Sequence, residues 1–249
     1  MPVLTNHDIR QVHDDGVMIL RGAFSEKIAE SAREQLWTGL KADPNDSSTW
    51  PDKSDIFDIE LSTDIMDGVF SERTVSALDE ILGEGCWTRH ENFRYHPINF
   101  PTQQQSWAEG GGWHVDGNWF DHSWTNTKQA LVILPLWSTI EANGGGTRVK
   151  AGSYKIAAEI LKKLNGETLD YKNFANQVLE RCDDFSDVFV EGQAGDLVIM
   201  HGYSLHTSAV NHSQHARLTT NSCVHLKTTP DFSEENEQPS LYEQTLNCI

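Results

Sequence analysis

From residue 87 onward, the sequence consists largely of short apolar segments separated by glycine-rich or polar turns. Segments of this kind predict β-strands. The longest of them, residues 130–139, is apolar over most of its length, which is typical of a central strand that is buried on both faces. Many short strands in one chain favour a sandwich or a barrel, because the apolar face of each sheet must be covered.

The first 86 residues predict a helical layer instead. We expect helices over about 5–15, 25–40 and 74–82, a strand over 17–21 and a loop over 42–56. The second helix is the clearest, because its apolar residues form one stripe: Ile28, Ala29, Ala32, Leu36 and Leu40. After residue 86 we expect helices over 154–164 and 171–181, and strands over 87–96, 113–116, 147–150, 187–190, 196–200, 204–208 and 218–227.

These elements together predict a mainly β protein with flanking helices, whose core is a double-stranded β-helix, the jelly roll of cupin-like proteins. The length of 249 residues is compatible with one domain. Within it we expect a helical layer over about 1–86, a jelly-roll core over about 87–227 and a polar, loosely held C-terminal tail over 228–249.

The charge of the chain narrows the range of partners. The formal net charge is −18, and no basic patch stands out in the sequence. Proteins that bind nucleic acids carry basic patches, and anionic membranes repel an acidic surface. We therefore expect neither nucleic acid nor a membrane as a partner, and a small molecule as the substrate.

The cysteines and the N-terminus bear on the cellular compartment. The four cysteines are widely spaced and form no Cys-x-x-Cys motif, so neither a zinc knuckle nor a thioredoxin-like motif is indicated, and lone thiols fit a reducing compartment. The N-terminal residues lack the basic and apolar regions of a signal peptide, and no apolar run approaches the length of a membrane span. We therefore expect a cytoplasmic protein of unknown oligomeric state.

A His-x-Asp triplet at His114 and Asp116 is the first candidate for a functional site. Because side chains alternate along a strand, two residues at this spacing point to the same face. Joined by a distant histidine, they would form a 2-His-1-carboxylate facial triad, which binds Fe(II) and leaves positions open. The triplet alone is weak evidence, since roughly one is expected by chance. His13 to Asp15 also fits, in a polar stretch that we interpret as surface.

The second candidate segment lies about ninety residues later and supplies the resemblance to a family. Its Gly-Asp pair precedes an apolar strand, a histidine, a second histidine five residues on, a serine, an asparagine and an arginine. This pattern resembles the phytanoyl-CoA dioxygenase-like group of Fe(II)/2-oxoglutarate oxygenases. The matching positions here are Gly195, Asp196, His201, His206, Ser208, Asn211 and Arg217.

The resemblance to this family extends over about residues 7–40 and 87–227. Trp137 matches the tryptophan of a family strand, and residues 143–153 match a turn that the family carries. The chain departs from the family within that turn, where Ala151 replaces a proline and Tyr154 replaces a histidine. The departure puts specific roles of the turn in doubt and leaves the predicted metal ligands intact.

Several histidines compete for the third metal position: His201, His206, His212, His215 and His225. His206 is the family match, and its strand leads through a turn to Arg217, so both residues can face one cavity. We interpret His201 as a structural residue at the end of a buried strand. His212 and His215 lie in a polar loop and are expected to be solvated, whereas His225 stays an alternative.

The resemblance also implies the cofactor contacts. It implies that 2-oxoglutarate chelates the iron through its 1-carboxylate and 2-oxo oxygens, and that O2 takes the remaining position. The far carboxylate needs a fixed cation, and we assign Arg217 because a guanidinium binds a carboxylate through two hydrogen bonds. Ser208 shares the parity of His206 and is expected to bind the same cosubstrate, unless it caps a turn. Trp137 is expected either to line this pocket or to lie in the core.

The predicted reaction is the hydroxylation, or another oxidation, of an unactivated C–H bond with release of succinate and CO2. Family members that halogenate have a small residue where this chain has Asp116, so the carboxylate favours hydroxylation. Aromatic residues crowd the His-x-Asp triplet and indicate either a substrate pocket or core packing: Trp107, Trp113, Trp119, Phe120 and Trp124.

Two other classes of function remain open at this stage. A non-catalytic jelly-roll binding protein has no need of His114, Asp116, His206 and Arg217 together. A zinc hydrolase accepts the same three ligands with an open water position, but gives no reason for Arg217 or Ser208.

Overall fold

The computed structural model describes residues 2–101, 112–128, 130–233 and 235–247. The N-terminal part contains the expected helices, and their caps explain where they begin. Thr5 accepts a hydrogen bond from the backbone of Asp8 in a capping box, and Ser25 caps the next helix through Ile28. The elements are α1 (Asn6–Asp14), β1 (Val17–Leu20), α2 (Glu26–Leu40), a 3-10 turn (Ser47–Thr49), β2 (Asp55–Asp58), α3 (Thr63–Val69) and α4 (Glu72–Leu82).

The remaining part consists of short strands that two helices interrupt, as the sequence predicts. The elements are β3 (Trp87–Arg89), β4 (Tyr95–Ile98), β5 (Leu131–Pro135), β6 (Thr147–Lys150), α5 (Ser153–Lys163), α6 (Tyr171–Cys182), β7 (Asp187–Phe189), β8 (Leu197–His201), β9 (His206–Ser208), β10 (Ser222–Leu226) and α7 (Leu241–Asn247). No helix in the described ranges combines the length and the apolar character that a bilayer crossing requires.

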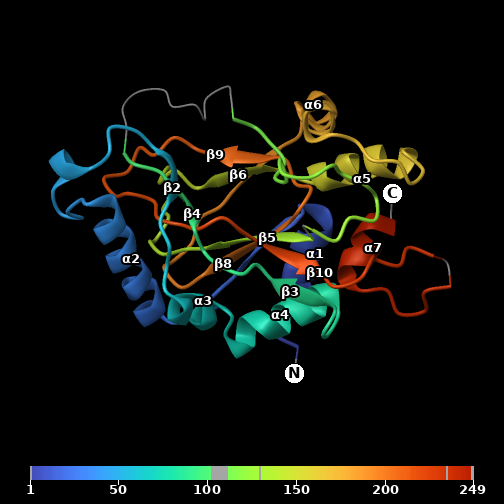
Figure 1. Cartoon of the computed structure of the whole chain (residues 1–249), viewed down its shortest axis with the longest axis horizontal. Coiled ribbons are helices and arrows are strands. Elements are labelled where there is room, and N and C mark those ends of the chain that lie inside the picture. Colours follow the sequence, from blue (N-terminus) through green and yellow to red (C-terminus); the bar gives the residue numbers. More distant parts are fainter. Residues whose placement is uncertain (1, 102–111, 129, 234, 248–249) are drawn as a thin grey trace.

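The strands form a jelly roll with helices on more than one side of it (Figure 1). The larger sheet has five strands in the order β1-β8-β5-β10-β3, and the smaller has the order β7-β6-β9. All the strand pairs in both sheets are antiparallel. Figure 1 shows the smaller sheet above the larger one, and α2, α3 and α4 on the opposite side of the larger sheet. The predicted fold class is confirmed.

Two apolar cores follow from the alternation of side chains along β5. Val132 and Leu134 pack between the two sheets, together with Val149 of β6. Leu131 and Ile133 face the other way and pack against the helical layer. The strand is buried on both faces, as its composition predicts. The space between the sheets is therefore the interior of the jelly roll. Because successive side chains of a strand point to opposite faces, every second residue of these strands faces that interior.

The strand predicted over residues 87–96 is in fact two strands of different sheets. His90 makes the last backbone contact of the first strand, where its N–H donates to Cys223 at 3.2 Å. Phe93 then turns into the helix-side core, and β4 pairs with β2 in a separate two-stranded sheet. β2 lies at the end of the segment that we expect to be a loop, and most of its residues are exposed. Its sequence carries no regular apolar alternation that would predict a strand.

The expectation of a loosely held C-terminal tail is wrong for the end of that segment. Residues of α7 share one helical face and are buried: Tyr242, Thr245 and Leu246. The ring of Tyr242 stacks on His201, with centroids 5.0 Å apart, and Tyr154 stacks on the same imidazole at 4.5 Å. The polar average of the segment hides this short apolar face.

The packing of α7 gives a test by stability. Replacing Tyr242 with alanine leaves a cavity beside His201 and should lower the free energy of unfolding by about 3 kcal/mol. Gln244→Ala alters an exposed residue of the same helix and should change that free energy by less than about 0.5 kcal/mol. Urea unfolding of both variants measures the difference. Equal stability of the two variants would show that the helix is not docked.

His201 gives a test by pH. Burial lowers its pKa to about 3, so the imidazole is neutral in the folded chain. The imidazole of the unfolded chain takes up a proton near about pH 6.5, whereas that of the folded chain does not. The contribution of His201 to the free energy of unfolding is therefore fully present above that pH and is lost as the pH falls below it. Between about pH 7 and about pH 5, His201→Gln should therefore lose about 2 kcal/mol less stability than the natural chain. His212→Gln, at an exposed histidine, should follow the natural chain in urea unfolding at both pH values.

Candidate metal centre

The structure brings His114, Asp116 and His206 together at one end of the jelly-roll interior. A reciprocal backbone bridge joins the two histidines: the His114 N–H donates to His206 at 3.0 Å, and the reverse bond is 2.9 Å. His114 Nε2 lies 3.5 Å from Asp116 Oδ1, and His206 Nε2 lies 3.7 Å from Asp116 Oδ2. All three residues offer a ligand atom within 4.8 Å of the others. The strand expected over residues 113–116 is reduced to this single bridge.

A tight turn after Asp116 helps to place the carboxylate. Gly117 has a φ of +103°, in the region that side chains other than glycine rarely adopt. A Cβ at this position would lie 2.7 Å from the ring of Phe120 and 2.8 Å from that of His122. The turn therefore requires glycine, both for its backbone conformation and for its close packing.

Hydrogen bonds on the far side of each ligand orient it toward the centre. His114 Nδ1 lies 2.6 Å from the carbonyl of Gly112, and His206 Nδ1 lies 3.0 Å from that of Ser204. Because a carbonyl only accepts, each Nδ1 carries a proton, and the neutral form of each ring therefore offers the lone pair of Nε2 to a metal ion. Asn221 Nδ2 donates to Asp116 Oδ2 at 3.0 Å. Two imidazole nitrogens and one carboxylate in this arrangement fit Fe(II).

The charges of these groups also suit a metal. Burial would raise the pKa of Asp116, but His206, His114 and the bond from Asn221 together hold it well below its usual range. Burial, with the proximity of His114, lowers the pKa of His206 to about 4. At neutral pH the carboxylate is therefore ionised and the His206 imidazole is neutral, which are the forms that bind metal ions.

Arg217 is a buried cation without an anionic partner among the residues that the structure describes. It is 2% exposed, and no carboxylate of the described residues lies within ion-pair distance. Nη2 donates to the carbonyl of Pro97 at 2.7 Å and to Ser208 Oγ at 3.2 Å, and Nη1 lies 3.4 Å from Thr147 Oγ1. Nε has no hydrogen-bond partner within the described part of the chain.

The guanidinium stays charged in this setting. Burial lowers the pKa of Arg217 to about 10, which is still above neutral pH. A buried charge without a partner is costly, and the described residues supply Arg217 with no carboxylate, so an anion at this position would stabilise the guanidinium. Ser208 lies two residues after His206 on β9 and faces the same interior, which links the three clustered ligands to the arginine.

Trp137 lies elsewhere. It is fully buried in the core between the larger sheet and the helices, on the face of its segment opposite to Leu136. Its Nε1 donates to Thr220 Oγ1 at 2.8 Å, and its ring packs on Phe24 and Phe93. The structure therefore does not place Trp137 beside the arginine.

The other candidate histidines are apart from the three clustered ligands. His201 is buried between two tyrosine rings, as a structural residue would be. His212 and His215 are exposed. His225 is half-buried on β10 and belongs to a different cluster.

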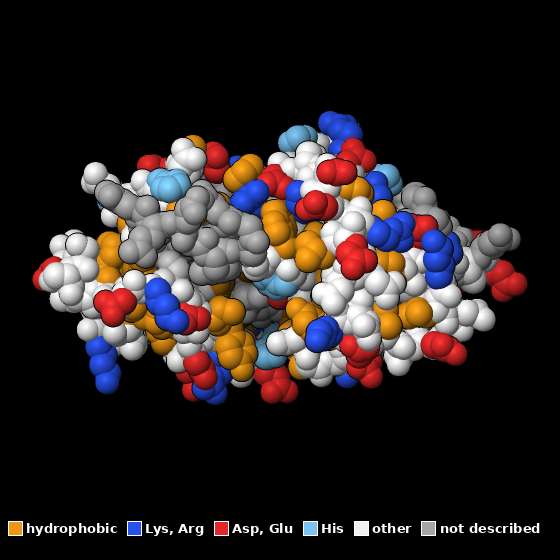
Figure 2. Space-filling view, turned by 90° about the horizontal axis from the view of Figure 1, so that it is seen from above, with side chains coloured by type: hydrophobic (Ala, Val, Ile, Leu, Met, Phe, Trp, Pro, Cys, Tyr) orange, Lys and Arg blue, Asp and Glu red, His pale blue; other side chains and the backbone are white. Residues whose placement is uncertain are grey.

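The aromatic residues near the triplet do not form one described pocket. Arg148 and Lys150 lie over the ring of Trp113, whereas Trp119 is 59% exposed and Trp124 packs on Phe232. Trp107 lies outside the described residues. Figure 2 shows a hollow near the centre of the face seen from above, with histidine side chains inside it.

Sequence analysis missed Asn221, which holds the carboxylate of Asp116. The alternation of side chains between the two faces of the segment after Arg217 could have identified it. Thr219 is bridged to Leu136, and Cys223 is paired with Val132, and both partners face the jelly-roll interior. Because side chains alternate, Arg217, Asn221 and His225 share that face.

Comparisons with known proteins agree with the fold. The family model described as phytanoyl-CoA dioxygenase matches residues 12–219. No curated protein matches the chain. Among solved structures, the alpha-ketoglutarate-dependent carbocyclase SnoK from nogalamycin biosynthesis has a TM-score of 0.57 at 12% identity, covering 95% of this chain and 92% of that one.

Two further solved structures have ligands named with them. The epimerase SnoN, in complex with Fe3+, alpha ketoglutarate and a nogalamycin ligand, has a TM-score of 0.59 at 13% identity, covering 94% of this chain and 91% of that one. HygX from Streptomyces hygroscopicus, with nickel and 2-oxoglutarate bound, has a TM-score of 0.55 at 14% identity, covering 96% of each chain. At these identities the likeness concerns the fold. With a family model matching most of its length, the chain belongs to the phytanoyl-CoA dioxygenase family of Fe(II)- and 2-oxoglutarate-dependent oxygenases.

Proposed function

We propose that His114, Asp116 and His206 bind Fe(II), and that Arg217 and Ser208 bind the far carboxylate of 2-oxoglutarate. The enzyme would be a dioxygenase that hydroxylates an unactivated C–H bond of a small molecule, with release of succinate and CO2. The observation that carries this proposal is the buried guanidinium, without a carboxylate partner in the described ranges, on the same interior face as a three-ligand cluster. A metal site alone gives no reason to bury a cation beside it.

The donor set and the bound states of structural relatives support the cofactors. Two imidazole nitrogens and one carboxylate suit Fe(II) and leave positions for other ligands. SnoN is described with Fe3+ and alpha ketoglutarate, and HygX with nickel and 2-oxoglutarate. Bound together, iron and 2-oxoglutarate would supply the activation of O2 that oxidises a C–H bond.

The residues of this chain would bind and orient the reactants. Arg217 offers Nε and the edges of its guanidinium to a carboxylate, and the anion would offset its buried charge. The Ser208 hydroxyl already accepts from Arg217 and would donate its own hydrogen to the same anion. Asn221 holds Asp116 in place. The apolar residues between the sheets would exclude water from the reacting atoms.

The carboxylate at position 116 favours hydroxylation over halogenation, because it occupies the position that a halide would need. Since SnoK is described as a carbocyclase and SnoN as an epimerase, other oxidative outcomes occur on this fold. A screen of small molecules for succinate formation above the uncoupled background, with product analysis, tests the reaction directly. Products without a new hydroxyl group would contradict hydroxylation and leave the cofactor assignment intact.

The assignment of Arg217 predicts a selective loss of cosubstrate affinity. Arg217→Met removes the charge at similar volume and should weaken 2-oxoglutarate binding by about 100-fold, because charge-assisted hydrogen bonds are lost. Fe(II) binding should stay unchanged. Anaerobic titration, read by the visible charge-transfer band of the iron–2-oxoglutarate complex, measures the affinity.

A matched control for that titration is Arg94→Met. Arg94 already pairs with Asp58 on the surface, so its loss should leave the affinity for 2-oxoglutarate unchanged. If Arg217→Met bound 2-oxoglutarate as tightly as this control, the arginine would not be the anchor. If the natural chain gave no charge-transfer band, the iron and 2-oxoglutarate assignment would itself be wrong.

The hydrogen bond of Asn221 predicts an effect on the metal. Asn221→Ala frees Asp116 to rotate and should weaken Fe(II) binding by about 10- to 100-fold, and Asp116→Gly should weaken it further. Asp121→Ala, at an exposed carboxylate a few residues on, is the control. Metal competition under anaerobic conditions measures the affinities. Unchanged Fe(II) binding in Asp116→Gly would remove this residue from the ligand set.

A further inference from the structure

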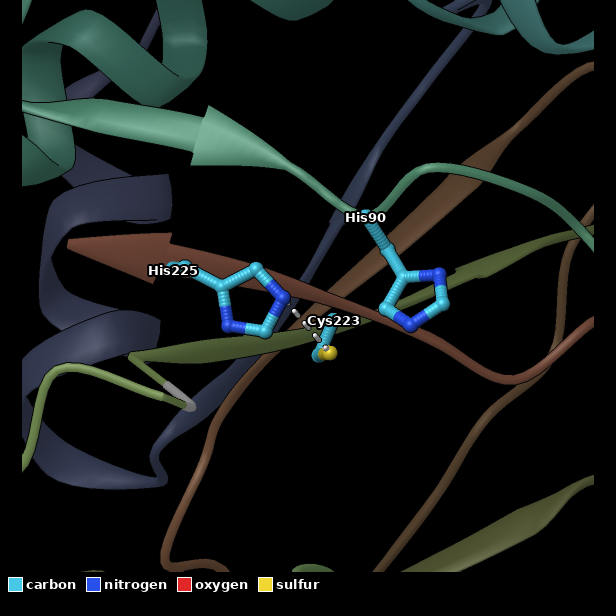
Figure 3. Close-up of side chains that lie close together, drawn as sticks. All are labelled: His90, Cys223 and His225. Atoms are coloured by element: carbon cyan, nitrogen blue, oxygen red, sulfur yellow. Dashed lines mark hydrogen bonds between the residues drawn. The ribbon is translucent and has the colours of Figure 1, made fainter. Parts of the chain in front are cut away.

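A second group of metal-ligating side chains lies on β10 and at the end of the neighbouring β3, outside the predicted iron site. His90, Cys223 and His225 each offer a ligand atom, and these atoms lie within 4.8 Å of one another. Figure 3 shows the two imidazole rings on either side of the cysteine sulfur. Cys223 is 6% exposed, and the histidines are half-buried, so an ion from solvent can reach the group.

The register of the larger sheet creates this cluster. β3 and β10 pair antiparallel, with Thr88 opposite His225, and the N–H of His90 donates to the carbonyl of Cys223. His90 therefore lies beside Cys223 on the neighbouring strand, while His225 follows two residues later on the same face. Cys223 is also paired with Val132, which faces the jelly-roll interior. All three side chains thus face the interior, where the cluster extends the polar row that begins at Arg217.

The distances and the hydrogen bonds match those of a metal site. Cys223 Sγ lies 3.6 Å from His225 Nε2. Zinc bonds of about 2.3 Å to sulfur and about 2.0 Å to nitrogen, at a tetrahedral angle, place those two atoms about 3.5 Å apart. His225 Nδ1 contacts the carbonyl of Lys128, and His90 Nδ1 lies 3.1 Å from that of Asn92. Both rings are held at Nδ1 by backbone contacts, at His90 through the carbonyl and the N–H of Asn92. With Nδ1 protonated, each ring offers Nε2 to a metal ion, which is the arrangement of metal-binding histidines.

We propose that His90, Cys223 and His225 form a second metal site, which binds a zinc-class cation through two imidazole nitrogens and one thiolate. Thiolate and imidazole ligands suit Zn²⁺, whereas the carboxylate-containing set at Asp116 suits Fe(II). The two sites share no ligand. Three protein ligands leave one of the four tetrahedral positions for water or an exogenous donor, so this is an open site.

The open coordination position of this second site lies close to the predicted iron site. Cys223 and His225 follow Asn221 by two and four residues on β10, and a strand rises about 3.3 Å per residue. The second site therefore begins about 7 Å along the strand from the residue that contacts Asp116. A donor atom of a molecule in the same cavity would be within reach of the ion, so the site is suited to holding a ligand beside the iron centre.

Cobalt distinguishes the two sites, because only the second contains sulfur. Co²⁺ added to the metal-free full-length chain should bind with two equivalents and should give a near-ultraviolet thiolate-to-cobalt charge-transfer band. Zn²⁺ should abolish the band by displacing Co²⁺. Cys223→Ser should lose the band and keep one equivalent of Co²⁺, and His225→Ala should weaken the band-forming site by about 100-fold or more.

Matched controls place the band at Cys223. Cys182→Ser alters another buried cysteine, and Cys86→Ser an exposed one, and both should keep the band. The double variant His114→Ala/His206→Ala should also keep it, with circular dichroism reporting that each variant is folded. The absence of a thiolate band in the folded natural chain would overturn the proposal. So would a band that survives Cys223→Ser or that disappears in Cys86→Ser.

Discussion

The reciprocal backbone bridge between His114 and His206 is the interaction on which the predicted iron site depends. It joins two segments that are far apart in the sequence, and it brings their imidazole rings to a centroid distance of 4.3 Å. Asp116 then needs only a glycine turn behind it and one hydrogen bond from Asn221 to complete the group. Two main-chain hydrogen bonds therefore fix the relative position of the two histidines, without a long strand pair between their segments.

The interior of the jelly roll has two chemically distinct parts. Deep between the sheets the side chains are aliphatic and close-packed, as in an ordinary core. Toward one end they become polar, and the buried Arg217 guanidinium there has no counter-ion among the described residues. Leaving a charge unpaired lowers stability, so the arrangement is understandable when an anion binds to it. The same burial would exclude competing water and strengthen each hydrogen bond to an anion bound there.

Much of this architecture could be predicted from the sequence, because period-two alternation and helix caps are local properties. The helices that begin after Thr5 and Ser25, and the strand over residues 147–150, are examples. The sequence also predicted His114, Asp116 and His206 as one group, and the structure brings their ligand atoms within 4.8 Å of one another. The split of residues 87–96 into two strands depends instead on pairing with two different sheets, which no local pattern contains.

Similar reasons explain the remaining differences. The docking of α7 depends on a short apolar face within a polar segment, and an average over that segment conceals it. The burial of Trp137 on the helix side depends on the parity of its segment relative to β10, which the sequence alone left open between pocket and core. The contact of Asn221 with Asp116 required the relative position of two strands, although its parity with Arg217 was already visible.

The alternating row on the strand from Arg217 to His225 also limits how this enzyme can change over evolution. Insertion or deletion of a single residue within the row would shift every later side chain to the opposite face. Val224 and Leu226 would then enter the cavity, while the thiol and the imidazole would move into the apolar helical side. Variation in this segment must therefore proceed by substitution, with its length conserved, whereas the turns outside the sheets are free to lengthen.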